Sequence, residues 1–109
     1  MLKKIINRYW PYLLIFALSF LVTWPVLRHG YFSHHDDLQV IRIFEMRRCL
    51  TDFQIPCRWV PDMGFGNGFP LFNFYGVFPY FLGAILSFVV GYINSAKILF
   101  LIPLLLGGI

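Results

Sequence analysis

The five consecutive residues from Ser33 to Asp37 are the clearest candidates for chemistry in this chain. They supply one hydroxyl, two imidazoles and two carboxylates directly after the first long apolar segment. A carboxylate at a membrane surface can accept a proton from a substrate that comes within hydrogen-bond range. Adjacent carboxylates can also bind a hard divalent cation through oxygen, and an imidazole can join them as a ligand. We therefore treat Asp37 and Asp36 as candidate catalytic residues, and Asp36, Asp37 and His35 as a candidate site for Mg²⁺ or Mn²⁺.

A structural role explains the same two carboxylates. Residues 37–52 have an amphipathic helical pattern, for which Asp36 is a good N-cap and Gln39 completes a capping box. The pattern predicts an apolar face and a polar face. The first holds Val40, Ile43, Phe44 and Leu50, and the second holds Arg42, Glu45, Arg48 and Asp52. Capping and catalysis both remain open on the sequence.

The composition is that of a membrane protein. Of the 109 residues, 59% are hydrophobic and only 13% are charged, whereas about a quarter of a soluble domain is charged. The net charge of +4 comes with no basic stripe, so we expect no nucleic-acid partner. The composition excludes an ordinary soluble enzyme and predicts that the partner is a lipid bilayer.

We predict an all-α integral membrane protein with three transmembrane helices, at about residues 10–27, 73–92 and 96–109. Lys3, Lys4 and Arg8 form an acid-free tail, which predicts a cytoplasmic N-terminus. Residues 28–72 then form a long outer loop that carries the amphipathic helix. A short inner connection at residues 92–97 would end at Lys97. The sequence stops inside an apolar run, so we expect residues 1–109 to be the N-terminal part of one larger polytopic domain.

The outer loop holds three further features. Cys49 and Cys57 could form a disulfide in an oxidising compartment, but spacing alone does not show that they meet. Residues 64–68 are glycine-rich without the ending of a phosphate loop, and we interpret them as turns. The arginines of the loop could bind a phosphate headgroup, since guanidinium matches phosphate oxygens. They are Arg42, Arg47, Arg48 and Arg58.

Several stretches together resemble a known family. An acidic pair opens the outer loop, and the helix with Arg42 and Glu45 follows it. Then come Ile55-Pro56-Cys57-Arg58-Trp59, Gly64-Phe65-Gly66-Asn67-Gly68-Phe69-Pro70 and Phe72-Asn73-Phe74-Tyr75, leading to Phe78-Pro79-Tyr80. Over about residues 10–109 this resembles the N-terminal region of bacterial 6-pyruvoyl-tetrahydropterin synthase-related membrane proteins, which look like relatives of the GT-C glycosyltransferases.

The resemblance implies a multi-pass enzyme of the bacterial inner membrane. Such an enzyme takes a sugar from a polyprenyl-phosphate donor on the outer face. An acidic residue of its first outer loop acts as base or metal ligand, and here that role falls on Asp37 or Asp36, with Asp37 preferred. Arg42, Glu45 and Arg58 are the candidate substrate-binding residues. The alternative is a non-catalytic membrane protein, such as a transporter component, an assembly component or a degenerate fragment.

Overall fold

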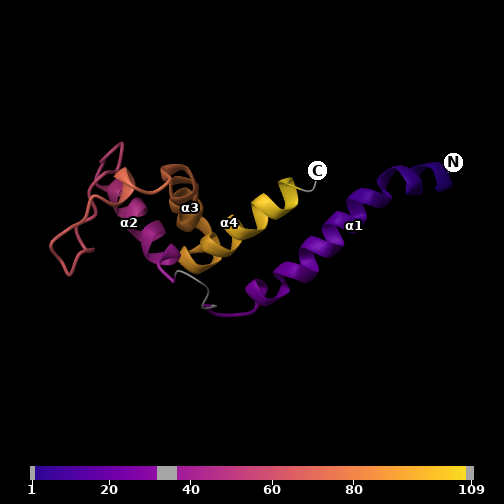
Figure 1. Ribbon diagram of the computed structural model, residues 1–109, viewed down its shortest axis with the longest axis horizontal. Coiled ribbons are helices and arrows are strands. Elements are labelled where there is room, and N and C mark those ends of the chain that lie inside the picture. Colours follow the sequence, from indigo (N-terminus) through magenta and orange to yellow (C-terminus); the bar gives the residue numbers. More distant parts are fainter. Residues whose placement is uncertain (1, 32–36, 108–109) are drawn as a thin grey trace. The chain divides into compact units, whose positions relative to one another are not determined.

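The computed structural model describes residues 2–31 and 37–107 of the chain, and all the regular elements in these ranges are helices (Figure 1). The all-α prediction is therefore confirmed. The elements are helix α1 (Leu2–Leu27), helix α2 (Gln39–Thr51), the short 3-10 helix η1 (Leu71–Asn73), helix α3 (Val77–Val90) and helix α4 (Tyr92–Leu106).

The contacts divide the chain into two compact units. We call the first the anchor unit; it comprises Met1–Phe32 and Lys97–Ile109. We call the second the loop unit; it comprises Ser33–Ala96. Helices α2 and α3 lie wholly within the loop unit, and the boundary between the units falls inside α4.

Helix α1 is the described helix that is long and apolar enough to cross a membrane. Its stretch Ile6–Leu27 has 22 residues and a mean hydropathy of 1.8. At about 1.5 Å per residue this stretch exceeds the roughly 30 Å of a hydrocarbon core. The helix begins before the predicted span and includes the basic tail. The other two predicted spans correspond to shorter helices, α3 with 14 residues and α4 with 15.

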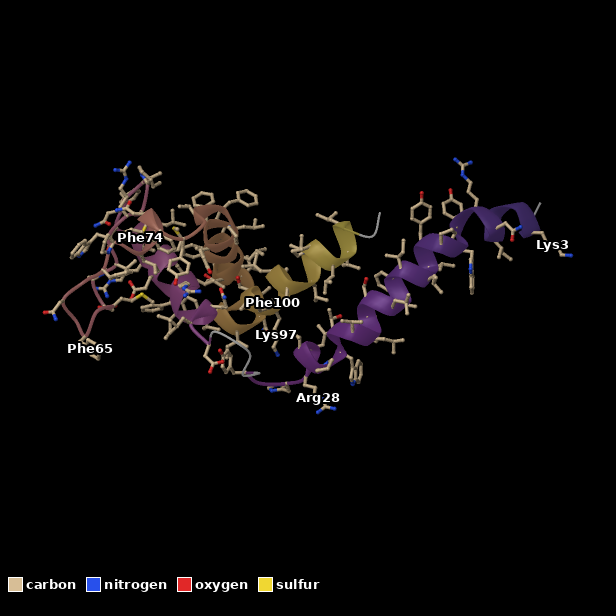
Figure 2. All side chains as sticks on the ribbon, in the orientation of Figure 1. Lys3, Arg28, Phe65, Phe74, Lys97 and Phe100 are labelled. Atoms are coloured by element: carbon tan, nitrogen blue, oxygen red, sulfur yellow. A yellow bond between two sulfur atoms is a disulfide. The ribbon has the colours of Figure 1, made fainter. Side chains whose placement is uncertain are left out.

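Within the anchor unit, Lys97 in the second turn of α4 contacts Arg28, the residue that follows α1. The ammonium group of Lys97 donates a hydrogen bond to the carbonyl oxygen of Arg28, at 2.5 Å (Figure 2 labels both residues). Arg28 directly follows α1. Lys97 therefore lies near the C-terminal end of α1, which Arg28 follows.

The loop unit is built around the packing of α2 against α3. A disulfide between Cys49 and Cys57 joins the last turn of α2 to the loop that follows it, with the two Cα atoms 5.5 Å apart. The disulfide that the sequence left open is therefore formed. It belongs to a core cluster made of Met46, Cys49, Cys57, Val60, Leu71, Phe72 and Ala84.

The loop between α2 and η1 is irregular but well tied together. Val60 and Phe69 exchange two backbone hydrogen bonds of 2.9 Å, which close a hairpin-like loop. Positive φ angles at Gly64, Gly66 and Gly68 form its turns, as glycine allows without a steric penalty. The interpretation of this stretch as turns is confirmed. Phe65 lies at the tip of the loop with its side chain fully exposed (Figure 2).

Two local predictions differ from the structure. Helix α2 begins at Gln39, and its N-cap is Leu38, which makes no side-chain capping bond. The Gln39 side chain instead accepts a hydrogen bond from the Tyr80 hydroxyl at 2.8 Å, so the predicted capping box is wrong. Asp36, the predicted N-cap, lies outside the described residues, as do Ser33, His34 and His35.

Candidate functional site

The candidate site residues that the structure describes lie in the loop unit, at the start of α2 and on the loop after it. Asp37 is exposed and precedes α2 by two residues. Arg42 and Glu45 lie on the first turns of α2, and Arg58 is exposed beside Cys57. Asp36 and His35, the other two predicted metal ligands, lie outside the described residues.

Arg42 is buried and held by two tyrosines from far along the chain. Only 3% of its surface is exposed. Its guanidinium carbon lies 4.2 Å from the centre of the Tyr75 ring and 5.8 Å from that of Tyr80. Its Nη1 also donates to the Tyr80 hydroxyl at 3.3 Å, and that hydroxyl donates to Gln39. Cation–π contacts of this kind gain strength as they lose solvent. The expected polar face of α2 is therefore wrong at Arg42.

Glu45 is also buried, with 1% of its surface exposed. Its Oε2 atom has no hydrogen-bond partner among residues 2–31 and 37–107. Burial raises the pKa of this carboxyl above its usual range, and the nearby Asp62 carboxylate raises it further, while Arg48 partly offsets both. A buried carboxylate without a partner is energetically costly. The prediction that Glu45 lies on the polar face of α2 is wrong, because its side chain is buried.

Changing Glu45 to glutamine is expected to stabilise the loop unit at neutral pH. A raised native pKa means that the folded state binds more protons than the unfolded state, so stability falls as pH rises above about 4.5. Glutamine keeps the shape and removes the charge, and the gain should be about 1 kcal/mol, within the usual cost of an unsatisfied buried group. Thermal unfolding in detergent, followed at several pH values, measures it.

The matched control for this prediction is Asp52→Asn, which changes an exposed carboxylate at the end of α2. The gain from Glu45→Gln should shrink toward acidic pH, where the native carboxyl is protonated. Equal gains from both variants, or a gain that does not depend on pH, would contradict the buried-charge explanation.

No metal centre can be assigned from the described residues. Within residues 2–31 and 37–107, no group of three or more His, Cys, Asp or Glu side chains is placed to hold a metal ion. Of the predicted ligands, only Asp37 is described, and an exposed carboxylate of its kind suits a hard cation such as Mg²⁺.

Sequence reasoning missed the part that aromatic residues play in holding the arginines of α2. Tyr75 and Tyr80 bind Arg42, and Phe88 and Tyr92 bind Arg47. The available signal was the aromatic run that continues into α3. These partners are separated from α2 by about thirty to forty-five residues in sequence, so no local pattern could pair them with particular arginines.

Comparisons with protein-family models, with curated proteins and with solved structures find no match to this chain.

Proposed function

We propose that this chain is part of a membrane glycosyltransferase of GT-C type, which transfers a sugar from a polyprenyl-phosphate donor at the outer membrane face. One observation carries the proposal: in the sequence, the exposed carboxylate of Asp37 follows a 22-residue apolar stretch and precedes helix α2, which a disulfide links to the next loop. A base at that position can reach a headgroup whose lipid tail stays in the bilayer. The resemblance of the sequence to such enzymes supports the same function.

In the proposed reaction, Asp37 accepts the proton from an acceptor hydroxyl. The hydroxyl oxygen forms a bond to the sugar carbon, and the bond from that carbon to the phosphate oxygen breaks. The electron pair of the broken bond leaves on the phosphate. Asp36 is the second candidate for the base, and Arg42, Glu45 and Arg58 are proposed to contact the substrate. Asp36, Asp37 and His35 would hold Mg²⁺ or Mn²⁺, which would supply charge neutralisation when bound.

Arg42 and Glu45 cannot contact a substrate from their buried positions in this structure. Both are almost fully buried, so they would act by positioning the start of α2 or after a rearrangement that exposes them. Arg58 is exposed and directly follows the disulfide residue Cys57. Of the three proposed substrate-binding residues, Arg58 is therefore the one that is ready to meet a headgroup.

The orientation that we propose has a cytoplasmic N-terminus in a bacterial inner membrane. The basic tail favours this orientation. The disulfide supports an outer location of the loop unit, since disulfides persist in oxidising compartments. A multi-pass arrangement is also proposed, because α3 and α4 are apolar and lie in a chain that already has one candidate span.

Two contacts favour a particular form of this multi-pass arrangement. Lys97 bonds to Arg28 beyond the end of α1, and Tyr92 packs its ring on Phe44 of α2, with ring centres 5.5 Å apart. We therefore favour α3 as part of the outer unit and α4 as the segment that returns into the membrane, over three separate spans.

A cysteine introduced at Asn94 is expected to react with a membrane-impermeant thiol reagent added outside intact cells. Asn94 is exposed in the first turn of α4, and both native cysteines are already paired. Labelling is read by a mass shift of the purified protein, and Lys3→Cys, in the basic tail before the candidate span Ile6–Leu27, is the control that should stay unlabelled. Protection of both positions would favour three spans instead.

A non-catalytic membrane protein is the second candidate function. The observation in its favour is Arg42, whose tyrosine contacts give it a structural role that needs no ligand. Growth complementation separates the two candidates, with surface glycans read by mass spectrometry. Loss of one glycan on deletion, restored by the wild-type gene and not by Asp37→Asn at normal protein level, supports the enzyme. Unchanged glycans on deletion favour the non-catalytic protein.

A further inference from the structure

A small open pocket lies between α2 and the first residue of α4, apart from the candidate base. Its volume is about 200 Å³, and its lining consists of Phe44, Arg47, Arg48, Thr51 and Tyr92. All five residues belong to the loop unit. Two guanidinium groups, two hydroxyls and two aromatic rings therefore surround a space of the size of a small anion with part of its organic group.

Arg47 is held rigidly at this pocket while most of its donors stay unused. Its Nη1 donates to the carbonyl oxygen of Ser87 at 3.0 Å. Its guanidinium carbon lies 4.1 Å from the centre of the Phe88 ring and 5.0 Å from that of Tyr92. An arginine has five N–H donors, and the Arg47 side chain makes only this one hydrogen bond within the part of the chain that the structure describes. The side chain is thus oriented in advance, with donors to spare.

The rest of the lining suits an anion attached to an organic body. The Tyr92 hydroxyl makes no hydrogen bond to residues 2–31 or 37–107, so it can donate one to a ligand. The rings of Phe44 and Tyr92 meet edge to face, with centres 5.5 Å apart, and provide an apolar side. Arg48 pairs with Asp62 at the rim, which leaves Arg47 as the main source of positive charge.

We propose that this pocket binds the phosphate group of a phosphate ester. A planar guanidinium offers paired N–H donors that match two phosphate oxygens, and its stacking on the rings of Phe88 and Tyr92 reduces the entropy lost on binding. The phosphate could belong to a lipid headgroup or to a water-soluble ester, which share this chemistry. Assigning the pocket to the phosphate of the sugar donor rests on the proposed function, whereas phosphate binding itself does not.

The test compares wild-type protein in neutral detergent with Arg47→Gln and Arg47→Lys. Calorimetric titration with inorganic phosphate measures the soluble form, and native mass spectrometry of phosphatidic acid retained from phosphatidylcholine nanodiscs measures the lipid form. We expect Arg47→Gln to weaken binding about tenfold, since hydrogen bonds to charged groups are among the stronger ones. Arg47→Lys should fall between, because it keeps the charge and loses the paired donors. Arg28→Gln, which removes an exposed arginine outside the pocket, should bind as wild type does.

Binding of phosphatidic acid alone would assign the pocket to a lipid headgroup, and binding of both probes would assign it to phosphate esters in general. No binding of either probe, or equal loss in Arg28→Gln and Arg47→Gln, would overturn the proposal. If near-ultraviolet circular dichroism shows that Arg47→Gln does not fold, Tyr92→Phe decides, since it removes only the donor and should weaken binding severalfold. Phosphate binding without sugar transfer would support this pocket and overturn the proposed function. Sugar transfer together with unaltered phosphate binding in Arg47→Gln would support the proposed function and overturn this pocket.

Discussion

Replacing Asp37 by asparagine should lower sugar transfer by the full-length protein by about a hundredfold to ten-thousandfold, the usual contribution of a positioned general base. Asparagine has nearly the same shape and cannot accept the proton of the acceptor hydroxyl. Asp37 is exposed and precedes the first residue of α2, and the N-cap of α2 is Leu38. The substitution should therefore leave the helix intact while removing the base.

The measurement is the initial rate of transfer from a polyprenyl-phosphate sugar in detergent, over a range of donor concentrations. The rate at saturating donor should fall while the donor concentration for half-maximal rate changes little, because a base acts in the chemical step. Asp52→Asn, at the other end of α2 and equally exposed, is the control that should retain full rate. A large drop in Asp52→Asn as well would point to a general charge effect.

Removing the disulfide should destabilise the loop unit by about 2 to 3 kcal/mol, a typical value for a short closed loop. Cys49 and Cys57 are eight residues apart in sequence and both are buried, with 3% of each exposed. The bond fixes the loop that carries Val60 against the end of α2, so the pair is part of the core as well as a covalent link. The double variant Cys49→Ala/Cys57→Ala removes the link without burying a new polar group.

Thermal unfolding of wild-type and double-variant protein in detergent, with and without a reductant, measures this effect. The reductant should lower the stability of the wild-type protein toward that of the double variant and leave the double variant unchanged. A double variant as stable as the oxidised wild type would show that the α2–α3 packing holds the unit without the covalent bond.

The sequence predicted those elements whose signals are local. The long apolar run predicts α1. The amphipathic pattern of residues 37–52 predicts α2 to within two residues at its start and one residue at its end. The start of α3 was placed four residues too early, because η1 and the Phe74–Gly76 segment intervene before Val77. The start of α4 was also misplaced, since Gly91, with φ at +82°, already separates it from α3.

The site was harder to predict because its partners lie far apart in sequence. Periodicity placed Arg42 on a polar face, but Tyr75 and Tyr80 cover it from more than thirty residues away. The same limit applies to Arg47, whose partners Ser87 and Phe88 come from the end of α3. Amphipathic patterns treat every arginine as a solvated charge, whereas aromatic partners let α2 bury Arg42 and partly bury Arg47.

The most direct test of the central claim is whether membranes containing the full-length protein transfer a labelled sugar from a polyprenyl-phosphate donor to any acceptor added from the outer side. The proposed function predicts transfer with the wild-type protein and its loss with Asp37→Asn at equal protein level. The absence of transfer from every polyprenyl-phosphate sugar tested, with protein that is folded and correctly oriented, would contradict it.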